Sequence, residues 1–124
     1  MMNSTPEPRR RHKRFSPSRA GIVCVPRGLW TSVLRKRNVA SHLKDVSLGG
    51  LQIIAGEPLR LGHKVDVTLT FAGFPDPVVL EAAVRWCRRD TLSLKPKWNA
   101  GLTIRHLAPQ HETRLKDVDR TYLG

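Results

Sequence analysis

The sequence predicts a small, mainly β fold, in which a barrel of short strands is followed by one α-helix. Two segments, residues 64–71 and 78–87, alternate between apolar and polar side chains, which is typical of strands with one buried face. Turn-forming residues separate several such short segments, as they do in barrels and sandwiches. A barrel is favoured because closure removes the exposed edges that short strands would otherwise present.

The strands are expected to begin at residue 20. Residues 20–25 are almost entirely apolar, which fits a strand that is buried on both faces and ended by Pro26 and Gly28. Residues 29–38 show no clear pattern beyond a basic turn. Further strands are expected at residues 39–45, 51–54, 64–71, 78–87 and 100–104.

Prolines mark boundaries in the C-terminal half of the chain. Gly73, Pro75 and Pro77 interrupt the alternation between the two longest strands. Pro109 suits the first position of a helix, which we expect over residues 109–122. The apolar face of this amphipathic helix is expected to consist of Leu115, Val118 and Tyr122.

Composition excludes several classes of protein. The chain has 124 residues, 40% of them hydrophobic, which is enough for one small packed core. No stretch of about 18 apolar residues occurs, so a membrane span is not expected. The polar start is unlike a secretory signal, and we expect a cytoplasmic protein. Cys24 and Cys87 lack the spacing of a disulfide framework or a zinc site, and the five histidines are scattered, so no metal is expected.

The domain organisation follows from these patterns. We expect a disordered leader at residues 1–8 and a single domain at residues 9–124. Within that domain we expect a flexible basic arm at residues 9–19, the barrel at residues 20–107 and the C-terminal helix at residues 109–122.

The arm carries a local concentration of the net charge of +12. Six Lys and Arg side chains fall within residues 9–19, and a charge of this kind favours an anionic partner such as a phosphate. Arg10 and Arg14 lie four positions apart, and each guanidinium is a planar fork matched to phosphate oxygens and to the O6 and N7 atoms of guanine. This spacing alone is weak evidence for a binding motif, because Arg85 and Arg89 repeat it by chance.

A second motif, Asp-x-Ser-x-x-Gly, occupies residues 45–50. The carboxylate of Asp45 can accept hydrogen bonds from the N1–H and the exocyclic amine of guanine. Ser47 can donate or accept, and Gly50 lets the backbone turn tightly beside a ligand. A plain hairpin turn would use the same residue types, so the motif alone leaves both interpretations open.

Together the two motifs resemble the PilZ domain, the bacterial receptor module for cyclic di-GMP (c-di-GMP). The resemblance begins with residues 10–15 and 45–50 and continues in residues 61–65, 83–86 and 100–104. It implies a six-stranded antiparallel β-barrel that binds c-di-GMP on its outer surface, without a cofactor or a metal. The ligand-binding residues that the motifs imply are Arg10, Arg14, Asp45, Ser47, Gly49 and Gly50.

Three further side chains are candidates for the same site. Arg9 and Arg11 flank the first motif and could stack on a guanine or contact a second ligand molecule, or they could remain solvated. Trp86 could form a stacking wall for the ligand, but its alternation with Leu80, Ala82 and Val84 favours packing in the core.

The function implied is that of a receptor and adaptor, in which c-di-GMP orders the arm and a protein partner recognises the new surface. The protein would be a monomer or a homodimer influenced by the ligand. Catalysis is not expected, because the chain lacks a nucleophile elbow and a phosphate-binding Gly-rich loop.

Two alternatives stay open. A nucleic-acid-binding small barrel fits the charge, but aromatic residues make up only 6% of the chain and form no stripe on one strand face. The second alternative is a PilZ-fold protein-interaction module without a ligand. It leaves the two complete motifs without a physical purpose.

Overall fold

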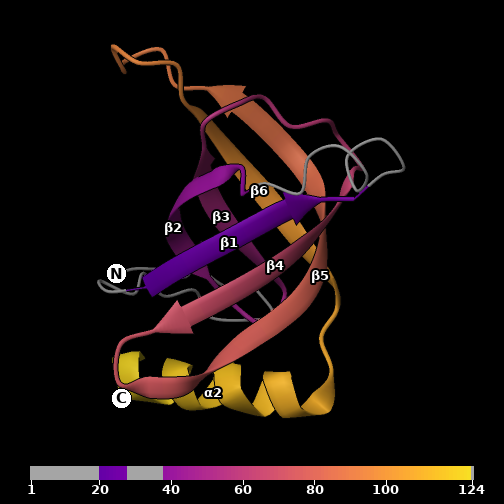
Figure 1. The fold of residues 1–124 in the computed structure, drawn as a ribbon, viewed down its shortest axis with the longest axis vertical. Helices are drawn as coiled ribbons and strands as arrows, with labels where there is room; N and C mark the ends of the chain where they lie inside the picture. The colour runs from indigo at the N-terminus through magenta and orange to yellow at the C-terminus, as the bar shows by residue number, and fades with distance from the viewer. Residues whose placement is uncertain (1–19, 28–37, 124) are drawn as a thin grey trace, which may run out of the picture.

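The computed structural model describes residues 20–27 and 38–123, which form a six-stranded sheet followed by a helix (Figure 1). The elements are β1 (Ala20–Pro26), β2 (Ala40–Val46), β3 (Gly50–Ala55), β4 (Lys64–Phe71), β5 (Phe74–Arg89), β6 (Trp98–His106) and α2 (Pro109–Leu123). The expected six-stranded antiparallel barrel with a C-terminal helix is confirmed. The predicted leader and basic arm lie outside the described residues.

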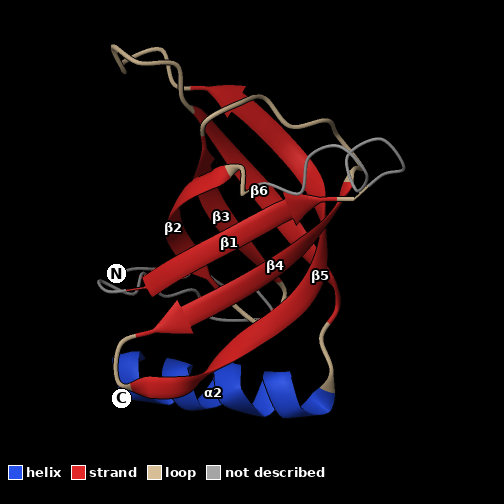
Figure 2. Cartoon of the chain, viewed as in Figure 1, coloured by secondary structure: helices blue, strands red, loops and turns tan. Residues whose placement is uncertain are grey.

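The strand order in the sheet is β1-β4-β5-β6-β3-β2, and all five neighbouring pairs are antiparallel. The longest strand, β5, has 16 residues. Its first part pairs with β4 and its last part with β6, so it connects the two halves of the sheet. The sheet curls until its two edge strands, β1 and β2, lie next to each other (Figure 2).

The amide side chain of Asn38 bridges these two edge strands. Its Oδ1 accepts hydrogen bonds from the backbone N–H of Cys24 at 2.7 Å and of Ala40 at 3.0 Å. Its Nδ2 donates to the backbone oxygen of Ile22 at 3.1 Å. One backbone hydrogen bond, from Val39 N–H to the oxygen of Cys24, lies beside them at 2.9 Å. The barrel is therefore closed largely by one side chain that takes the place of a backbone ladder.

The inner faces of all six strands contribute to one hydrophobic core. Leu115 and Val118 of α2 are buried against it, and the helix lies across one end of the barrel (Figure 2). The side chain of the third expected helix residue, Tyr122, lies outside the described part. Cys24 is fully buried, and this burial, aided by the charge of Asp66, raises the pKa of its thiol to about 12. A thiol in this state is unreactive.

Two expectations about the strands are wrong. The strand β1 is buried on one face only, because Ile22 and Cys24 point into the core while Val23 is 46% exposed on the outside. Residues 75–77, which include two prolines, lie inside β5 and do not end it. Only Thr70 lies between the paired positions opposite these residues, so the ladder is interrupted there and a proline removes no required hydrogen bond.

Candidate functional site

Four residues form a row across the outer face of the barrel. The strand registers pair Asp45 of β2 with Gln52 of β3, Gln52 with Gly101 of β6, and Gly101 with Trp86 of β5. Directly opposed residues in antiparallel strands point to the same face of a sheet. This face is the outer one, because the chain neighbours on the other side of the sheet are the buried residues Val46, Leu51 and Leu102.

A β-bulge brings Trp86 to this outer face. Val84 pairs with Leu102, but Trp86 pairs with Gly101, so Arg85 is an extra residue in the strand. The extra residue reverses the alternation of the side chains from that point on. The sequence-based expectation that Trp86 shares the apolar inner face with Val84 is therefore wrong.

Trp86 lies directly against the backbone of β6. A Cβ atom built on Gly101 would fall 2.1 Å from the indole Nε1 and 2.5 Å from Cε2. A side chain at residue 101 would therefore collide with the indole, and glycine is what allows the ring to lie there. Half-buried Trp86 thus presents one flat wall on the outer face.

The hydroxyl of Ser47 organises the turn between β2 and β3. Its Oγ accepts hydrogen bonds from the N–H groups of Gly49 and Gly50, both at 3.2 Å, and donates to the oxygen of Gly50 at 3.3 Å. The backbone N–H of Ser47 donates to the same oxygen at 2.8 Å, and the side chain is only 5% exposed. The oxygen of Gly49 accepts from Ile104 N–H at 3.0 Å, which fastens the turn to β6.

Gly50, the second glycine of this turn, does not have a positive φ. Among the described glycines a positive φ occurs at Gly62 and Gly73. Gly50 instead begins β3 in extended conformation, opposite Thr103 of β6. A residue without a side chain there leaves the outer face open beside the turn.

A shallow pocket of about 80 Å³ lies between the turn and the indole wall. Its lining includes Gly49, Gly50, Gln52, Arg85, Trp86 and Gly101. Asp45 stands one strand further along the row, next to Gln52. The structure therefore gathers four of the predicted residues at this pocket or at its turn, and places Asp45 on the same face.

The predicted arginines, Arg9, Arg10, Arg11 and Arg14, lie outside the described residues. Positive charge is nevertheless present on the face itself. Arg85 is exposed at the bulge, and the guanidinium of Arg88 lies over the indole of Trp86, 5.5 Å from the ring centroid. Lys44 of β2 donates to Asn99 Oδ1 of β6 at 3.3 Å.

Sequence reasoning missed three residues that line the pocket. The spacing of Arg85 and Arg89 alone does not distinguish a site from a chance repeat, and Gly101 lies inside an expected strand at residues 100–104. Gln52 could have been found from the sequence. It is the polar residue inside the apolar segment 51–54, and a polar residue in a strand is expected to face outward.

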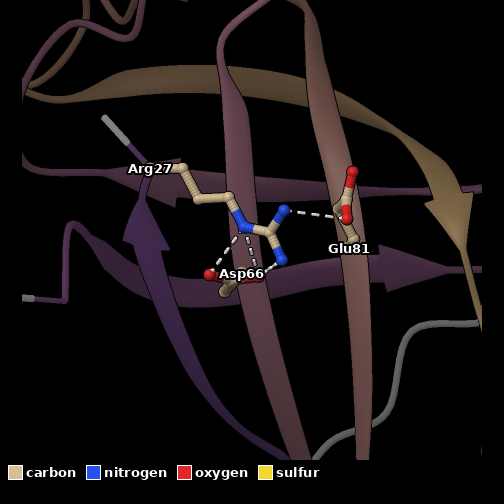
Figure 3. A network of polar contacts seen from close by, with 3 residues as sticks. All are labelled: Arg27, Asp66 and Glu81. Atoms are coloured by element: carbon tan, nitrogen blue, oxygen red, sulfur yellow. Dashed lines mark hydrogen bonds and ion pairs between the residues drawn. The ribbon is translucent and has the colours of Figure 1, made fainter. Parts of the chain in front are cut away.

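A separate polar network lies on the outer face of β1, β4 and β5 (Figure 3). The Nε of Arg27 donates to both carboxylate oxygens of Asp66 at 2.8 and 2.9 Å, and Nη2 contacts the same group at 2.7 Å. Nη1 forms an ion pair with Glu81 at 3.0 Å. The hydrogen bond to Asp66 raises the pKa of Arg27 further above its usual value. These contacts occupy the guanidinium and tie the residue that follows β1 to β4 and β5.

Two kinds of site are not found in the described part of the chain. Residues 20–27 and 38–123 contain no group of three or more His, Cys, Asp and Glu side chains placed to hold a metal ion. No helix within these ranges is both long and apolar enough to cross a membrane.

The fold is thus a small antiparallel barrel, and its outer face carries a candidate site in the pocket beside Trp86. The sequence matches the PilZ domain over residues 8–118, and the chain belongs to this family. The comparison with curated proteins found no match.

Solved structures of PilZ proteins have the same fold. The chain superposes on the PilZ domain with c-di-GMP of YcgR from Escherichia coli with a TM-score of 0.66 and 14% identity, covering 92% of this chain and 91% of that one. For the MrkH–c-di-GMP complex of K. pneumonia the TM-score is 0.67 at 18% identity, covering 89% of this chain and 50% of that one. The apo state of MrkH gives 0.69 at 14% identity. The chain thus spans about half the length of MrkH.

Proposed function

We propose that this protein is a receptor for c-di-GMP that acts as an adaptor and not as an enzyme. The observation that carries the proposal is the row in which Asp45 is linked through Gln52 and Gly101 to the indole wall of Trp86, beside the turn of the Asp-x-Ser-x-x-Gly motif. The family supports it, because related PilZ structures are described with this nucleotide.

Each part of the ligand has a matching group on this face. The carboxylate of Asp45 accepts hydrogen bonds from the N1–H and the 2-amino group of one guanine. The indole of Trp86 stacks on a base when the guanidinium of Arg88, which lies over the ring, moves aside, since a flat aromatic ring binds any purine face. Arg85 provides a positive charge for a phosphate.

The remaining groups come from the arm. A pocket of about 80 Å³ holds only a small part of a cyclic dinucleotide, because enclosed ligand sites are usually about 300 Å³ or larger. The ligand therefore lies on an open face and needs a cover. We assign that role to residues 9–19, with Arg10 and Arg14 on the phosphates and guanine edges, and with Arg9 and Arg11 at their flanks.

In this proposal Ser47 acts through the turn. Its hydroxyl is already hydrogen-bonded to the backbone of Gly49 and Gly50, so its contribution is to fix the position of those residues beside the ligand. Ordering of the arm over the barrel then creates the surface that a protein partner recognises.

Isothermal titration with c-di-GMP and cyclic di-AMP tests the assignment of Asp45. Adenine has no N1–H and no 2-amino group, so Asp45→Ala should weaken c-di-GMP binding more than cyclic di-AMP binding. Asp76→Ala, at an exposed carboxylate near the start of β5, is the matched control and should leave both unchanged. Equal losses for both nucleotides would mean that Asp45 does not read guanine.

The arm is tested in the same titration. Arg10→Ala and Arg14→Ala should each cost about 2–5 kcal/mol of binding free energy, as expected for a buried charged contact. Arg120→Ala, at the C-terminal end of α2, is the control. Amide exchange over residues 9–19 should slow when c-di-GMP is added, and an unchanged rate would contradict the covering role.

Salt dependence separates this function from nucleic-acid binding. Binding to nucleic acid falls steeply with salt and should be insensitive to Asp45→Ala, whereas guanine recognition depends on that carboxylate.

A further inference from the structure

The loop between β5 and β6, residues 90–97, carries two fully exposed leucines. Leu92 is 94% exposed and Leu94 is 104% exposed, whereas the next most exposed large hydrophobic side chain among the described residues, Leu61, is 66% exposed. Figure 1 shows this loop projecting beyond the strands at the end of the molecule opposite α2. A single exposed leucine is common, but two fully exposed leucines at one projecting tip form a small apolar patch.

The exposure is built into the hairpin. The paired strands end at Arg89 and Trp98, and Asp90 N–H donates to the oxygen of Lys97 at 2.8 Å. The carboxylate of Asp90 accepts from Leu92 N–H at 3.0 Å. These contacts define the base of the loop and direct the chain that carries both leucines away from the barrel.

Four cationic residues lie in this loop or in the strand ends beside it. The exposed residues Arg88, Arg89 and Lys95 and the half-buried Lys97 face one carboxylate in the same segment, that of Asp90. The guanidinium of Arg89 lies over the Trp98 ring, 5.7 Å from its centroid, which holds it at the base of the loop. A positively charged collar thus lies behind an apolar tip.

We propose that the 90–97 loop docks on an anionic membrane surface, with Leu92 and Leu94 entering the headgroup–acyl boundary and the collar contacting lipid phosphates. Apolar insertion and cationic attraction act together in this mode, since neither two leucines nor four cations alone bind a bilayer firmly. The amphipathic Trp98 at the base suits the interface region. Arg88 borders both this surface and the candidate nucleotide site, but the leucine tip and the tested residues, Lys95 and Lys97, are separate from that site.

The size and shape of the tip favour a membrane over other partners. A stable protein–protein contact needs about 800 Å² from each partner, far more than two side chains at a loop tip supply. Nucleic acid would use the collar but has nothing to gain from exposed leucines. A lipid surface accepts a small insertion of this kind because it deforms around it.

Vesicle sedimentation with the full chain tests the proposal. The probes are vesicles of equal parts phosphatidylcholine and phosphatidylglycerol, and vesicles of phosphatidylcholine alone. We expect the protein to sediment with the anionic vesicles. The double variant Leu92→Ser/Leu94→Ser should lower the partition coefficient at least about tenfold, and Lys95→Gln/Lys97→Gln should lower it about tenfold through the lost charge.

The matched control is Leu61→Ser, at the exposed leucine before β4, which should bind as the wild type does. This control also accounts for binding through the basic residues 9–19, which all variants share. Thermal unfolding should be unchanged in the leucine variants, because the replaced side chains make no buried contact. The proposal is overturned if the wild type ignores anionic vesicles, if the double leucine variant binds like the wild type, or if Leu61→Ser loses as much.

Discussion

The indole of Trp86 lies so close to Gly101 on the neighbouring strand that a single added carbon would fall 2.1 Å from its Nε1. This contact exists because the bulge at Arg85 turns Trp86 to the outer face. The shape of the candidate site is thus set by a missing side chain on β6 as much as by the residues of the Asp-x-Ser-x-x-Gly motif.

Replacing Gly101 by alanine should displace the indole. The new methyl group overlaps Nε1 and Cε2, so Trp86 must rotate away, and we expect a loss of about 1–3 kcal/mol in the free energy of unfolding. Urea unfolding followed by tryptophan fluorescence measures both effects, and c-di-GMP affinity should fall in parallel. Gly56→Ala is the control, because nothing lies within 4 Å of a Cβ there. Equal behaviour of the two variants would show that the indole wall is not held by Gly101.

Removing the bridge at Asn38 should loosen the junction between β1 and β2. Asn38→Ala leaves the N–H groups of Cys24 and Ala40 without their acceptor, which should cost about 1–3 kcal/mol. Hydrogen exchange at Cys24 N–H should accelerate more than exchange in β5. The control, Asn99→Ala, removes only an exposed contact to Lys44, and its effect should be small. Slow exchange at Cys24 in the Asn38 variant would mean that the backbone alone closes the barrel.

The buried thiol of Cys24 should make stability fall at high pH. Its pKa is about 12 in the folded protein against the ordinary value of 9.0, so the unfolded chain ionises first as the pH rises. Below pH 9 the thiol is protonated in both states and stability does not vary with its ionisation, whereas above pH 9 the wild type should lose up to about 1.4 kcal/mol per pH unit. Cys24→Val cannot ionise and should lack this added loss in urea unfolding between pH 7 and 11. Parallel pH profiles for the two proteins would contradict this, and Cys87→Val controls for the second thiol.

The Arg27 network should stabilise the protein in a salt-dependent way. Arg27→Ala removes the contacts to Asp66 and Glu81, which join β1 to β4 and β5. These groups are exposed, so the loss in melting temperature should be clear at low salt and shrink as salt screens the charges. Arg27→Lys keeps the charge without the planar fork, so its melting temperature should lie between those of the wild type and Arg27→Ala. A loss that salt does not alter would assign the effect to packing instead.

Much of the fold could be predicted because its signals are local. The strand at residues 64–71 has the predicted bounds, and the helix ends one residue later than expected, since alternation and helical spacing depend on nearby residues only. The outer face of β1 could not be predicted, because an apolar residue such as Val23 gives no sign of which neighbour covers it.

The candidate site could be predicted only in part. The motif at residues 45–50 indicated the turn, because serine and glycine at that spacing form local hydrogen bonds that are typical of turns. The position of Trp86 could not be deduced, since it depends on a bulge that arises from pairing between β5 and β6. Gln52 and Gly101 join Asp45 only through strand register, which is a property of the folded sheet.

The amide of Asn38 has a mechanical consequence. Five junctions between neighbouring strands are backbone ladders, three of them with bulges or irregularities, whereas at the junction that Asn38 bridges one backbone hydrogen bond lies beside the amide. We therefore expect β1 to separate from β2 before the ladders from β4 through β6 to β3 open. The barrel is therefore expected to open between β1 and β2, and β2 is the strand that carries Asp45.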